Sequence, residues 1–263
     1  MKKLFAMTVA VLLLFSVLLG IPAAYGQAPE TGKTLDILFS HDTHSHLNTF
    51  TTVVEDEETD IGGFARANTL IKAQRAKDPD TLVIDGGDFS MGTLIQTVFE
   101  TQAAELRMLG YMGYDVTTFG NHEFDYGYAQ LKENMSKAKF KVVCADVFNE
   151  DGTPIFDANY TYTTKSGVKV GFFGMETPET QTKANPALIK GLTFATGDAF
   201  TKAAADQVAA LKDADVVICL AHLGVDAESA PYRSTDLYAA VKGIDFIIDG
   251  HSHTVMTKGE KGE

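Results

Sequence analysis

The sequence predicts an α/β fold, because short apolar runs typical of buried strands alternate with longer stretches whose apolar residues recur at helical spacing. Hydrophobic residues make up 45% of the 263 residues, enough to build a sizeable core. A third observation concerns the ends of the apolar runs, where glycine, histidine and aspartate gather. Ligands of open α/β sheets bind beyond the carboxyl ends of the strands, so these endings also indicate where the functional site lies.

The first 26 residues differ from the rest of the chain. A basic start at Lys2 and Lys3 precedes an apolar run from Leu4 to Leu19, and small residues follow in "GIPAAYGQA". This pattern predicts a signal peptide over residues 1–26, cleaved after Gly26, and therefore an exported protein. The alternative is an uncleaved membrane anchor, because the run approaches the ~18 apolar residues that suggest a membrane span. Cleavage would leave residues 27–263 as the folded domain, with no stable membrane span.

The elements of the folded domain follow from local patterns. Apolar, β-rich runs predict strands, apolar residues at helical spacing predict helices, and Ser166-Gly167 between two β-rich runs predicts a hairpin over 160–175. The acidic segment 54–60 is predicted to be a solvated loop, and a helix is expected between the last two strands. The predicted strands are 34–40, 81–85, 115–120, 141–147, 215–221 and 244–249, and the predicted helices are 64–77, 98–113, 127–138 and 198–212.

Charge and cysteine content restrict the partners of the protein. The net charge of −13 becomes more negative if residues 1–26 are removed, because they carry Lys2 and Lys3 and no acidic residue. Such a surface repels long phosphate backbones, which excludes a nucleic-acid polymer as a partner. A small anionic substrate would need a local positive centre, which bound metal could supply. The two cysteines, Cys144 and Cys219, lie in apolar strand-like runs, which favours buried free thiols and leaves a disulfide as the alternative.

Five predicted strands end in the same kind of polar sequence. Six of the seven histidines lie at these endings, and His46 lies just past the first of them. Five such coincidences are difficult to attribute to five unrelated turns, so a shared site is predicted at this edge of the fold. The endings are His41-Asp42-Thr43-His44, Gly86-Gly87-Asp88, Gly120-Asn121-His122, His222 and Gly250-His251-Ser252-His253.

The side chains at these endings predict a metal site. Carboxylates and imidazoles suit Zn²⁺, Mn²⁺ or Fe rather than a thiolate-bound metal. Seven donors are too many for one tetrahedral centre and suit two ions ~3.5–4 Å apart that share a carboxylate. Asp88, behind two glycines, is the best candidate for that bridge. The predicted donors are Asp42, His44, Asp88, Asn121, His222, His251 and His253.

Not every polar residue at these endings is predicted to bind metal. His122 follows the neutral ligand Asn121 and would remain free to act as an acid. A turn over 122–125 would bring Asp125 next to His122 as its orienting partner. Glu123, His41 and His46 are predicted to be structural.

The ordered set "DTH", "GGD", "GNHEFD", "AHLG" and "GHSH" resembles the calcineurin-like metallophosphoesterases over residues 34 to about 258. More narrowly, "FGNHEFDYG" and "DGHSHTVM" resemble the exported 5′-nucleotidase branch. The resemblance implies a four-layer α/β/β/α sandwich of two mixed sheets and an enzyme that hydrolyses phosphate from nucleotides. It implies that His122, with Asp125, stabilises the phosphoryl transition state and assists the leaving oxygen. The implied ligands are Asp42, His44, Asp88 and His253 for one metal, and Asp88, Asn121, His222 and His251 for the other.

The sequence departs from this family in two places. Some members of the branch carry glutamine where this chain has His253, which leaves the identity of the metals open. Family nucleotidases also continue into a second domain that contacts the base and the phosphate, whereas this sequence ends at Glu263. We therefore expect that substrate-binding domain to be absent, and this chain alone to discriminate poorly among phosphate esters.

Other functions remain open at this point. Within the branch, the alternatives are a 2′,3′-cyclic-nucleotide phosphodiesterase/3′-nucleotidase and a UDP-sugar hydrolase. An amidohydrolase barrel could use His44 and His46 as paired ligands, but it leaves the Gly120-Asn121-His122 ending unexplained and expects more β/α repeats. A non-catalytic metal-binding domain is the alternative from outside the enzymes.

Overall fold

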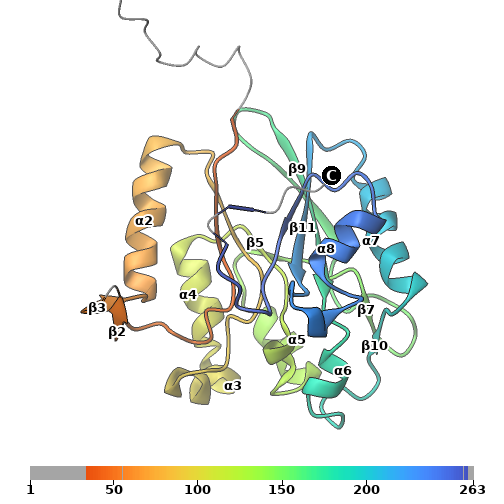
Figure 1. The fold of residues 1–263 in the computed structure, drawn as a ribbon, viewed down its shortest axis with the longest axis horizontal. Helices are drawn as coiled ribbons and strands as arrows, with labels where there is room; N and C mark the ends of the chain where they lie inside the picture. The colour runs from red at the N-terminus through yellow and green to blue at the C-terminus, as the bar shows by residue number, and fades with distance from the viewer. Residues whose placement is uncertain (1–33, 55, 257, 260–263) are drawn as a thin grey trace, which may run out of the picture. The chain divides into compact units, whose positions relative to one another are not determined.

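The computed structural model describes residues 34–54, 56–256 and 258–259 (Figure 1). The described residues from Leu35 onward form one unit. The predicted signal peptide, residues 1–26, lies outside the described residues. No helix within the described ranges is long and apolar enough to cross a membrane.

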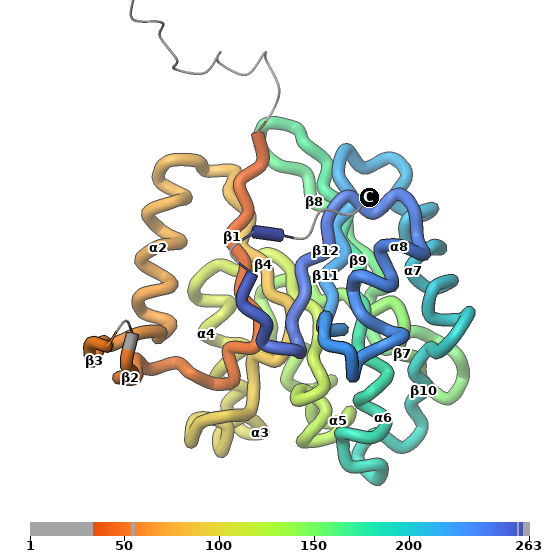
Figure 2. The backbone as a smooth tube through the Cα atoms, in the orientation of Figure 1, coloured from red at the N-terminus to blue at the C-terminus, as the bar shows by residue number. Residues whose placement is uncertain are grey.

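Two four-stranded sheets form the centre of the fold (Figures 1 and 2). The first has the order β1-β4-β5-β6 and is parallel throughout. The second has the order β12-β11-β9-β8 and is mixed, because β8 pairs antiparallel with β9 in the predicted hairpin. The strands are β1 (Ile37–Ser40), β4 (Leu82–Asp85), β5 (Val116–Thr117), β6 (Lys141–Val142), β8 (Asn159–Thr163), β9 (Lys169–Glu176), β11 (Val216–His222) and β12 (Phe246–Ile248).

Helices cover the outer face of each sheet, and two short antiparallel pairs complete the described elements (Figure 1). The helices are α2 (Phe64–Lys77), α3 (Phe99–Gln102), α4 (Ala104–Met112), α5 (Tyr128–Met135), α6 (Thr180–Lys183), α7 (Asp198–Ala210) and α8 (Ser234–Ala240). The 3₁₀ helices are η1 (Leu94–Val98), η2 (Asn121–Phe124) and η3 (Ala227–Ser229). The short pairs are β2 (Phe50–Val54) with β3 (Glu57–Ile61), and β7 (Val147–Phe148) with β10 (Thr193–Phe194).

The core confirms the predicted four-layer sandwich, although the structure has one parallel and one mixed sheet instead of two mixed sheets. Successive side chains of a strand point to opposite faces of its sheet. In β4, Leu82 and Ile84 therefore pack between the two sheets, against residues such as Phe172 of β9, while Val83 packs against the helices on the other face. A third cluster lies between the second sheet and helices α7 and α8. Strands buried on both faces read as continuous apolar runs, which is why their positions could be predicted.

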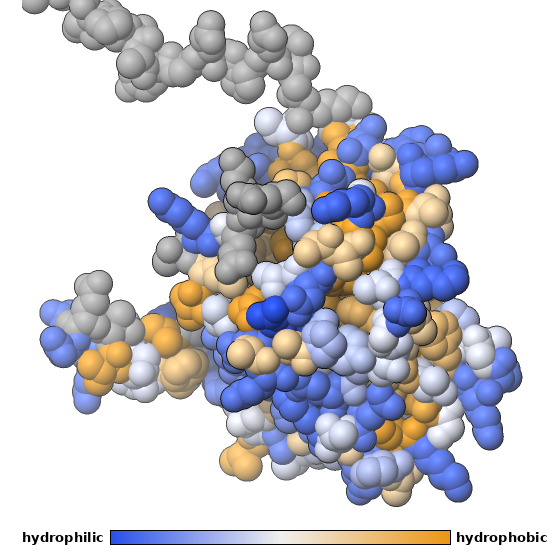
Figure 3. Space-filling view, turned by 45° about the vertical axis from the view of Figure 1, so that its right-hand side comes forward, coloured by the Kyte–Doolittle hydropathy of each residue, from blue (hydrophilic) through white to orange (hydrophobic). Residues whose placement is uncertain are grey.

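Side-chain burial confirms one further prediction and shows where exposed apolar side chains lie. Cys144 and Cys219 are buried free thiols, as predicted. Hydrophobic residues are scattered among hydrophilic ones over the face shown in Figure 3. Two of the exposed large apolar side chains, Phe39 and Phe246, lie on the sheet-edge strands β1 and β12.

Four local predictions differ from the structure. The strand predicted over 141–147 divides into β6 and β7, which belong to different sheets. Residues Glu57–Ile61 form strand β3 instead of a loop, because β-branched residues there pair in register with β2; residues 57–60 are solvent-exposed as expected. The helix predicted over 98–113 is broken at Ala103, which has a φ of 45° and separates α3 from α4. Strand β5 ends after Thr117, two residues before the predicted polar ending begins.

Candidate metal centre

The polar endings predicted to meet do lie together in the structure. Asp42 and His44 follow β1, Asp88 follows β4, His122 lies in η2, His222 ends β11, and His251 and His253 follow β12. Both sheets therefore contribute to one site. The ligand-capable atoms form three overlapping groups, and within each group all of them lie within 4.8 Å of one another. These groups are Asp42-His44-His253, His44-Asp88-His122 and Asp88-His222-His251.

Unusual backbone conformations turn these side chains into the site. Asp42, His44, Asp88, His251 and His253 all have positive φ angles, between 42° and 77°. A left-handed conformation costs a residue with a Cβ roughly 1–2 kcal/mol. Such strain concentrates at functional sites, where the surrounding structure holds it in place. These conformations explain how residues two positions apart can face the same point.

Gly120 and Gly250 lie so close to the predicted ligands that a side chain at either position would clash with them. A Cβ on Gly120 would overlap Oδ1 of Asp88 and stand 2.6 Å from Nε2 of His222. A Cβ on Gly250 would lie 2.9 Å from both Oδ2 of Asp42 and Nδ1 of His222. The glycines next to the predicted ligands are thus required by close approach.

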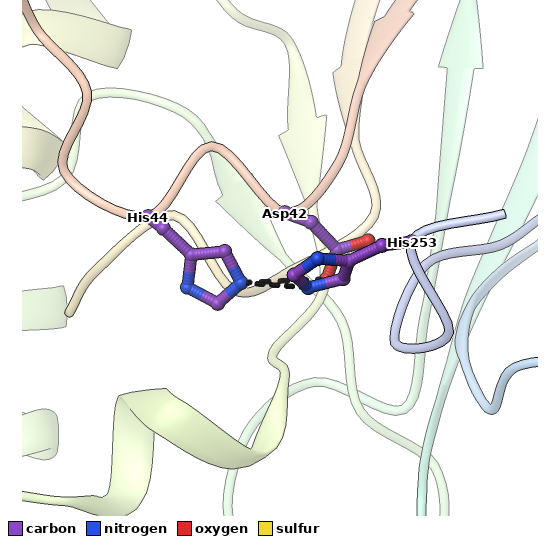
Figure 4. A group of neighbouring side chains, drawn as sticks. All are labelled: Asp42, His44 and His253. Carbon is purple, nitrogen blue, oxygen red and sulfur yellow. Dashed lines mark hydrogen bonds and ion pairs between the residues drawn. The ribbon is translucent and has the colours of Figure 1, made fainter. Parts of the chain in front are cut away.

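The first group of donors comprises Asp42, His44 and His253 (Figure 4). Nε2 of His44 lies 3.0 Å from Nε2 of His253, and the two rings approach from different sheets. Oδ1 of Asp42 lies 3.5 Å from Nε2 of His253 and 3.9 Å from Nε2 of His44. Three donor atoms therefore face one point.

The second group adjoins the first through Asp88. Oδ2 of Asp88 lies 3.1 Å from Nε2 of His222 and 3.9 Å from Nε2 of His44. The rings of His222 and His251 meet edge to face, with their centroids 5.2 Å apart. Asp42 and Asp88 each lie within 4 Å of histidines of both groups. Asp88 is the carboxylate that belongs to two of the three ligand groups, which is the position a bridging ligand requires.

The protons on the histidines suit metal binding. Nδ1 of His44 lies 2.9 Å from the carbonyl oxygen of Met91, and Nδ1 of His222 lies 2.8 Å from that of Gly86. Because a carbonyl oxygen only accepts, Nδ1 donates in each case, and in the neutral ring the lone pair is on Nε2. Metal-binding histidines are typically held in this way by a partner on the far nitrogen.

The side-chain oxygen of Asn121 provides an independent test of whether a cation fits. This atom is buried and has no hydrogen-bond partner within the described residues. A buried polar atom without a partner costs free energy, and native proteins rarely leave one unexplained. A divalent ion between Asn121 and the neighbouring carboxylate and imidazoles would satisfy it, so the donor set fits a metal.

Charge in the site is balanced between carboxylates and imidazoles. Burial opposes ionisation of Asp88, but the charge and hydrogen bond of His222, together with the backbone N–H and charge of His122, outweigh it and lower the pKa of Asp88. Burial lowers the pKa of both His44 and His251, which favours the neutral rings that a metal needs. The pKa of His222 is raised instead, because nearby carboxylates, Asp88 first, outweigh its burial. A cation would replace that proton, so metal binding is expected to release protons.

His122 and Asp125 make the contact predicted for them. Nδ1 of His122 lies 2.7 Å from Oδ2 of Asp125, and this hydrogen bond raises the pKa of His122. The backbone N–H of His122 donates to Oδ1 of Asp88 over 2.9 Å, which ties the histidine to the centre of the site. The His122 side chain is 40% exposed, so part of the ring faces solvent.

The chain matches the model of the calcineurin-like phosphoesterases over residues 36–255. It belongs to that family. In sequence, this phosphoesterase chain is 28% identical to the trifunctional nucleotide phosphoesterase protein YfkN of Bacillus subtilis, over 95% of this chain and 18% of that protein. It is 32% identical to a 2′,3′-cyclic-nucleotide 2′-phosphodiesterase/3′-nucleotidase of Haemophilus influenzae, over 86% of this chain and 37% of that protein.

Solved structures show the same relationship. The 5′-nucleotidase precursor from Thermus thermophilus superposes with a TM-score of 0.75 at 28% identity, over 86% of this chain and 43% of that one. The calcineurin-like phosphoesterase YfkN from Bacillus subtilis gives a TM-score of 0.72, also at 28% identity, over 86% of this chain and 74% of the solved chain. The phosphoesterase chain spans less than half the length of the two curated relatives above.

The structure also places the histidines classed as structural. Nδ1 of His41 lies 2.6 Å from Oδ2 of Asp42, so His41 contacts a predicted ligand although it is outside the donor set. Nδ1 of His46 lies 3.2 Å from the carbonyl oxygen of Thr43 and remains outside the site.

Glu123 is a buried residue that joins two loops of the phosphoesterase site. Its side chain is fully buried, and its carboxylate accepts hydrogen bonds from the backbone N–H groups of Asp88, Ser90 and Gly120 and from the Ser90 hydroxyl. These four donors fix the loops that follow β4 and β5. The residue was assigned a structural role from sequence, and its contacts show that this role is to join two of the polar endings.

Glu123→Gln should therefore destabilise the fold. A glutamine amide has one acceptor oxygen instead of two. Its NH₂ group would face the backbone N–H groups of Asp88 and Gly120, which now donate to Oε2 of Glu123. We expect the free energy of unfolding in urea to fall by about 2–4 kcal/mol. The control is Glu133→Gln, which changes an exposed carboxylate on α5 and should stay within about 0.5 kcal/mol of the unmodified chain. Equal stability of the two variants would contradict this role for Glu123.

Proposed function

We propose that residues 27–263 form the catalytic domain of an exported phosphoesterase that uses two divalent metal ions to hydrolyse phosphate esters of nucleotides. The observation that carries this proposal is the position of Asp88, a buried carboxylate that belongs to two of the three ligand groups and lies within 4 Å of imidazole nitrogens from both sheets. Export rests on the sequence pattern of residues 1–26. The nucleotide substrate is supported by the activities of the relatives named above.

Two ligand sets would hold the ions. Asp42, His44, Asp88 and His253 would hold one, and Asp88, Asn121, His222 and His251 would hold the other. Oxygen and imidazole donors suit Zn²⁺, Mn²⁺ or Fe. When bound, the ions would supply the positive charge that binds the phosphate group and stabilises its transition state. This local charge is what an acidic protein needs to bind an anionic ester.

His122 would act on the leaving oxygen. Asp125 accepts a hydrogen bond from Nδ1 and so directs Nε2 away from itself, toward the substrate. By raising the pKa of His122, Asp125 also keeps a proton on the ring to higher pH. Nε2–H can then donate that proton to the departing oxygen, which is general acid catalysis. His122 also lies within the His44-Asp88-His122 group, and metal retention in a His122 variant distinguishes an acid from a ligand.

An activity assay with metal control tests the proposed function. The purified chain should hydrolyse p-nitrophenyl phosphate and adenosine monophosphate with added Mn²⁺ or Zn²⁺, and EDTA should abolish both activities reversibly. The two specificity constants are expected within about tenfold of each other, a difference of about 1.4 kcal/mol. Preferential hydrolysis of 2′,3′-cyclic AMP or of UDP-glucose would select one of the alternative activities. Two bound ions without hydrolysis of any of these esters would instead support a non-catalytic metal-binding domain.

A further inference from the structure

His251 is held differently from the other histidines of the metal centre. The far nitrogens of His44 and His222 face backbone carbonyl oxygens. Nε2 of His251 instead lies 3.1 Å from Oε2 of Glu179, a side chain in the loop between β9 and α6. A single substitution can therefore remove the partner of His251, whereas no side-chain change removes a backbone carbonyl.

Two groups compete for Nε2 of His251. Nζ of Lys183 lies 3.2 Å from the same nitrogen and 2.7 Å from Oε2 of Glu179. If Nε2 carries the proton, it donates to Glu179, and Nδ1 keeps a lone pair that can bind a metal. If Nε2 accepts from Lys183, the proton of the neutral ring must lie on Nδ1. The two side chains thus favour opposite tautomers, and only one tautomer leaves Nδ1 available.

The remaining contacts hold the His251 ring in one orientation. Its backbone N–H donates to the carboxylate of Asp42 over 3.0 Å, and its ring packs edge to face against His222. With the ring fixed and Nε2 occupied, the nitrogen that remains for the metal is Nδ1. The ion pair with Lys183 holds the Glu179 carboxylate against the ring and draws the ammonium group toward a carboxylate oxygen.

We propose that Glu179 is a positioning residue for the metal centre. By accepting a hydrogen bond from Nε2–H of His251, it selects the tautomer whose Nδ1 lone pair faces the metal. The consequence for metal binding rests on the proposed function, whereas the tautomer is a property of the chain's own residues. Each can therefore be measured separately.

The tautomer is tested by ¹⁵N NMR of histidine-labelled protein without added metal, with the His251 signals assigned from a His251→Gln variant. The unmodified chain should show the proton on Nε2. Glu179→Met keeps the length of the side chain but removes the acceptor, so Lys183 can donate and the proton should move to Nδ1. Glu179→Gln keeps an acceptor oxygen and should retain the proton on Nε2, as should Lys183→Met.

Metal affinity is tested by competition with a chelator on the same variants. Glu179→Met should bind the more weakly held ion roughly 10- to 100-fold less tightly, and Glu179→Gln should recover most of that loss. The matched control is Glu133→Met, which removes the carboxylate of the exposed Glu133–Lys137 pair on α5, also spaced i to i+4. It should leave the affinity unchanged.

Unchanged tautomer and affinity in Glu179→Met, within about twofold, would overturn the role of Glu179. Equal losses in Glu179→Met and Glu179→Gln would also overturn it, because charge rather than hydrogen-bond acceptance would then be responsible. An unmodified chain that binds no second ion contradicts the proposed function, and the NMR comparison then decides the role of Glu179 by itself. Circular dichroism on all variants separates these outcomes from loss of folding.

Discussion

Replacement of Asp88 by alanine is expected to remove both metal ions and reduce phosphoesterase activity roughly 10³-fold or more. Asp88 is 1% exposed, and its Oδ2 lies between histidines of the two donor groups. Neither set of remaining donors keeps the shared carboxylate, so both ions should be lost together. The measurement is the number of metal ions per chain by elemental analysis, with p-nitrophenyl phosphate hydrolysis assayed on the same sample.

Two further variants distinguish the loss of a metal ligand from a folding defect. Asp88→Asn keeps an acceptor oxygen for the backbone N–H of His122 and should fold, yet it lacks the charge that the bridge requires. Asp206→Ala removes an exposed carboxylate that pairs with Lys202 on α7, and it should retain two ions and full activity. Undiminished metal content in Asp88→Ala would exclude Asp88 as the bridge.

His122→Ala should separate catalysis from metal binding. We expect the variant to keep its metal content and to lose roughly 10²–10⁴-fold in kcat, the range typical of a lost general acid. Asp125→Asn should lose less, because the imidazole remains and only its orientation and proton affinity change. Loss of metal from a folded His122→Ala protein would instead show that His122 is a ligand.

The effect of Asp125 on the pKa of His122 also predicts the direction in which the pH dependence of kcat should shift. Asp125 raises the pKa of His122 above its ordinary value, so the protonated acid persists to higher pH and activity falls as pH rises through that raised value. Without the carboxylate in Asp125→Asn, the pKa returns toward its ordinary value. The alkaline fall in kcat should therefore move to lower pH. A profile that does not move would contradict the pairing of His122 with Asp125 during catalysis.

Much of this site could be predicted from the sequence because its signals are local. The central strands β4 and β11 are buried and read as apolar runs, and each polar ending lies at the end of a strand or within three residues of it. Parallel pairing brings the endings of each sheet to one edge of that sheet, so Asp42 could be placed near Asp88, and His222 near His251. The approach of the two edges depends on how the sheets pack. The positive φ angles that aim Asp42 and Asp88 were not predictable, because neither residue type requires them.

The roles of Glu123 and Glu179 depend on tertiary contacts, which a local sequence pattern does not reveal. Glu123 joins two loops through four hydrogen bonds, and nothing in "GNHEFD" distinguishes such a residue from an exposed acid. The sequence does contain a pattern that indicates the position of Glu179. Strand β9 also ends in a polar sequence, "ETPET", which is a sixth ending beside the five identified. The break at Ala103 was hidden because alanine favours a continuous helix.

The most direct measurement is a crystal structure of the chain with Mn²⁺ or Zn²⁺, in which anomalous scattering locates each ion. The dinuclear centre predicts two peaks separated by ~3.5–4 Å. One peak should lie among Asp42, His44 and His253, the other among Asn121, His222 and His251, with the Asp88 carboxylate bound to both. A single peak, or two peaks that do not share Asp88, would contradict the proposed centre.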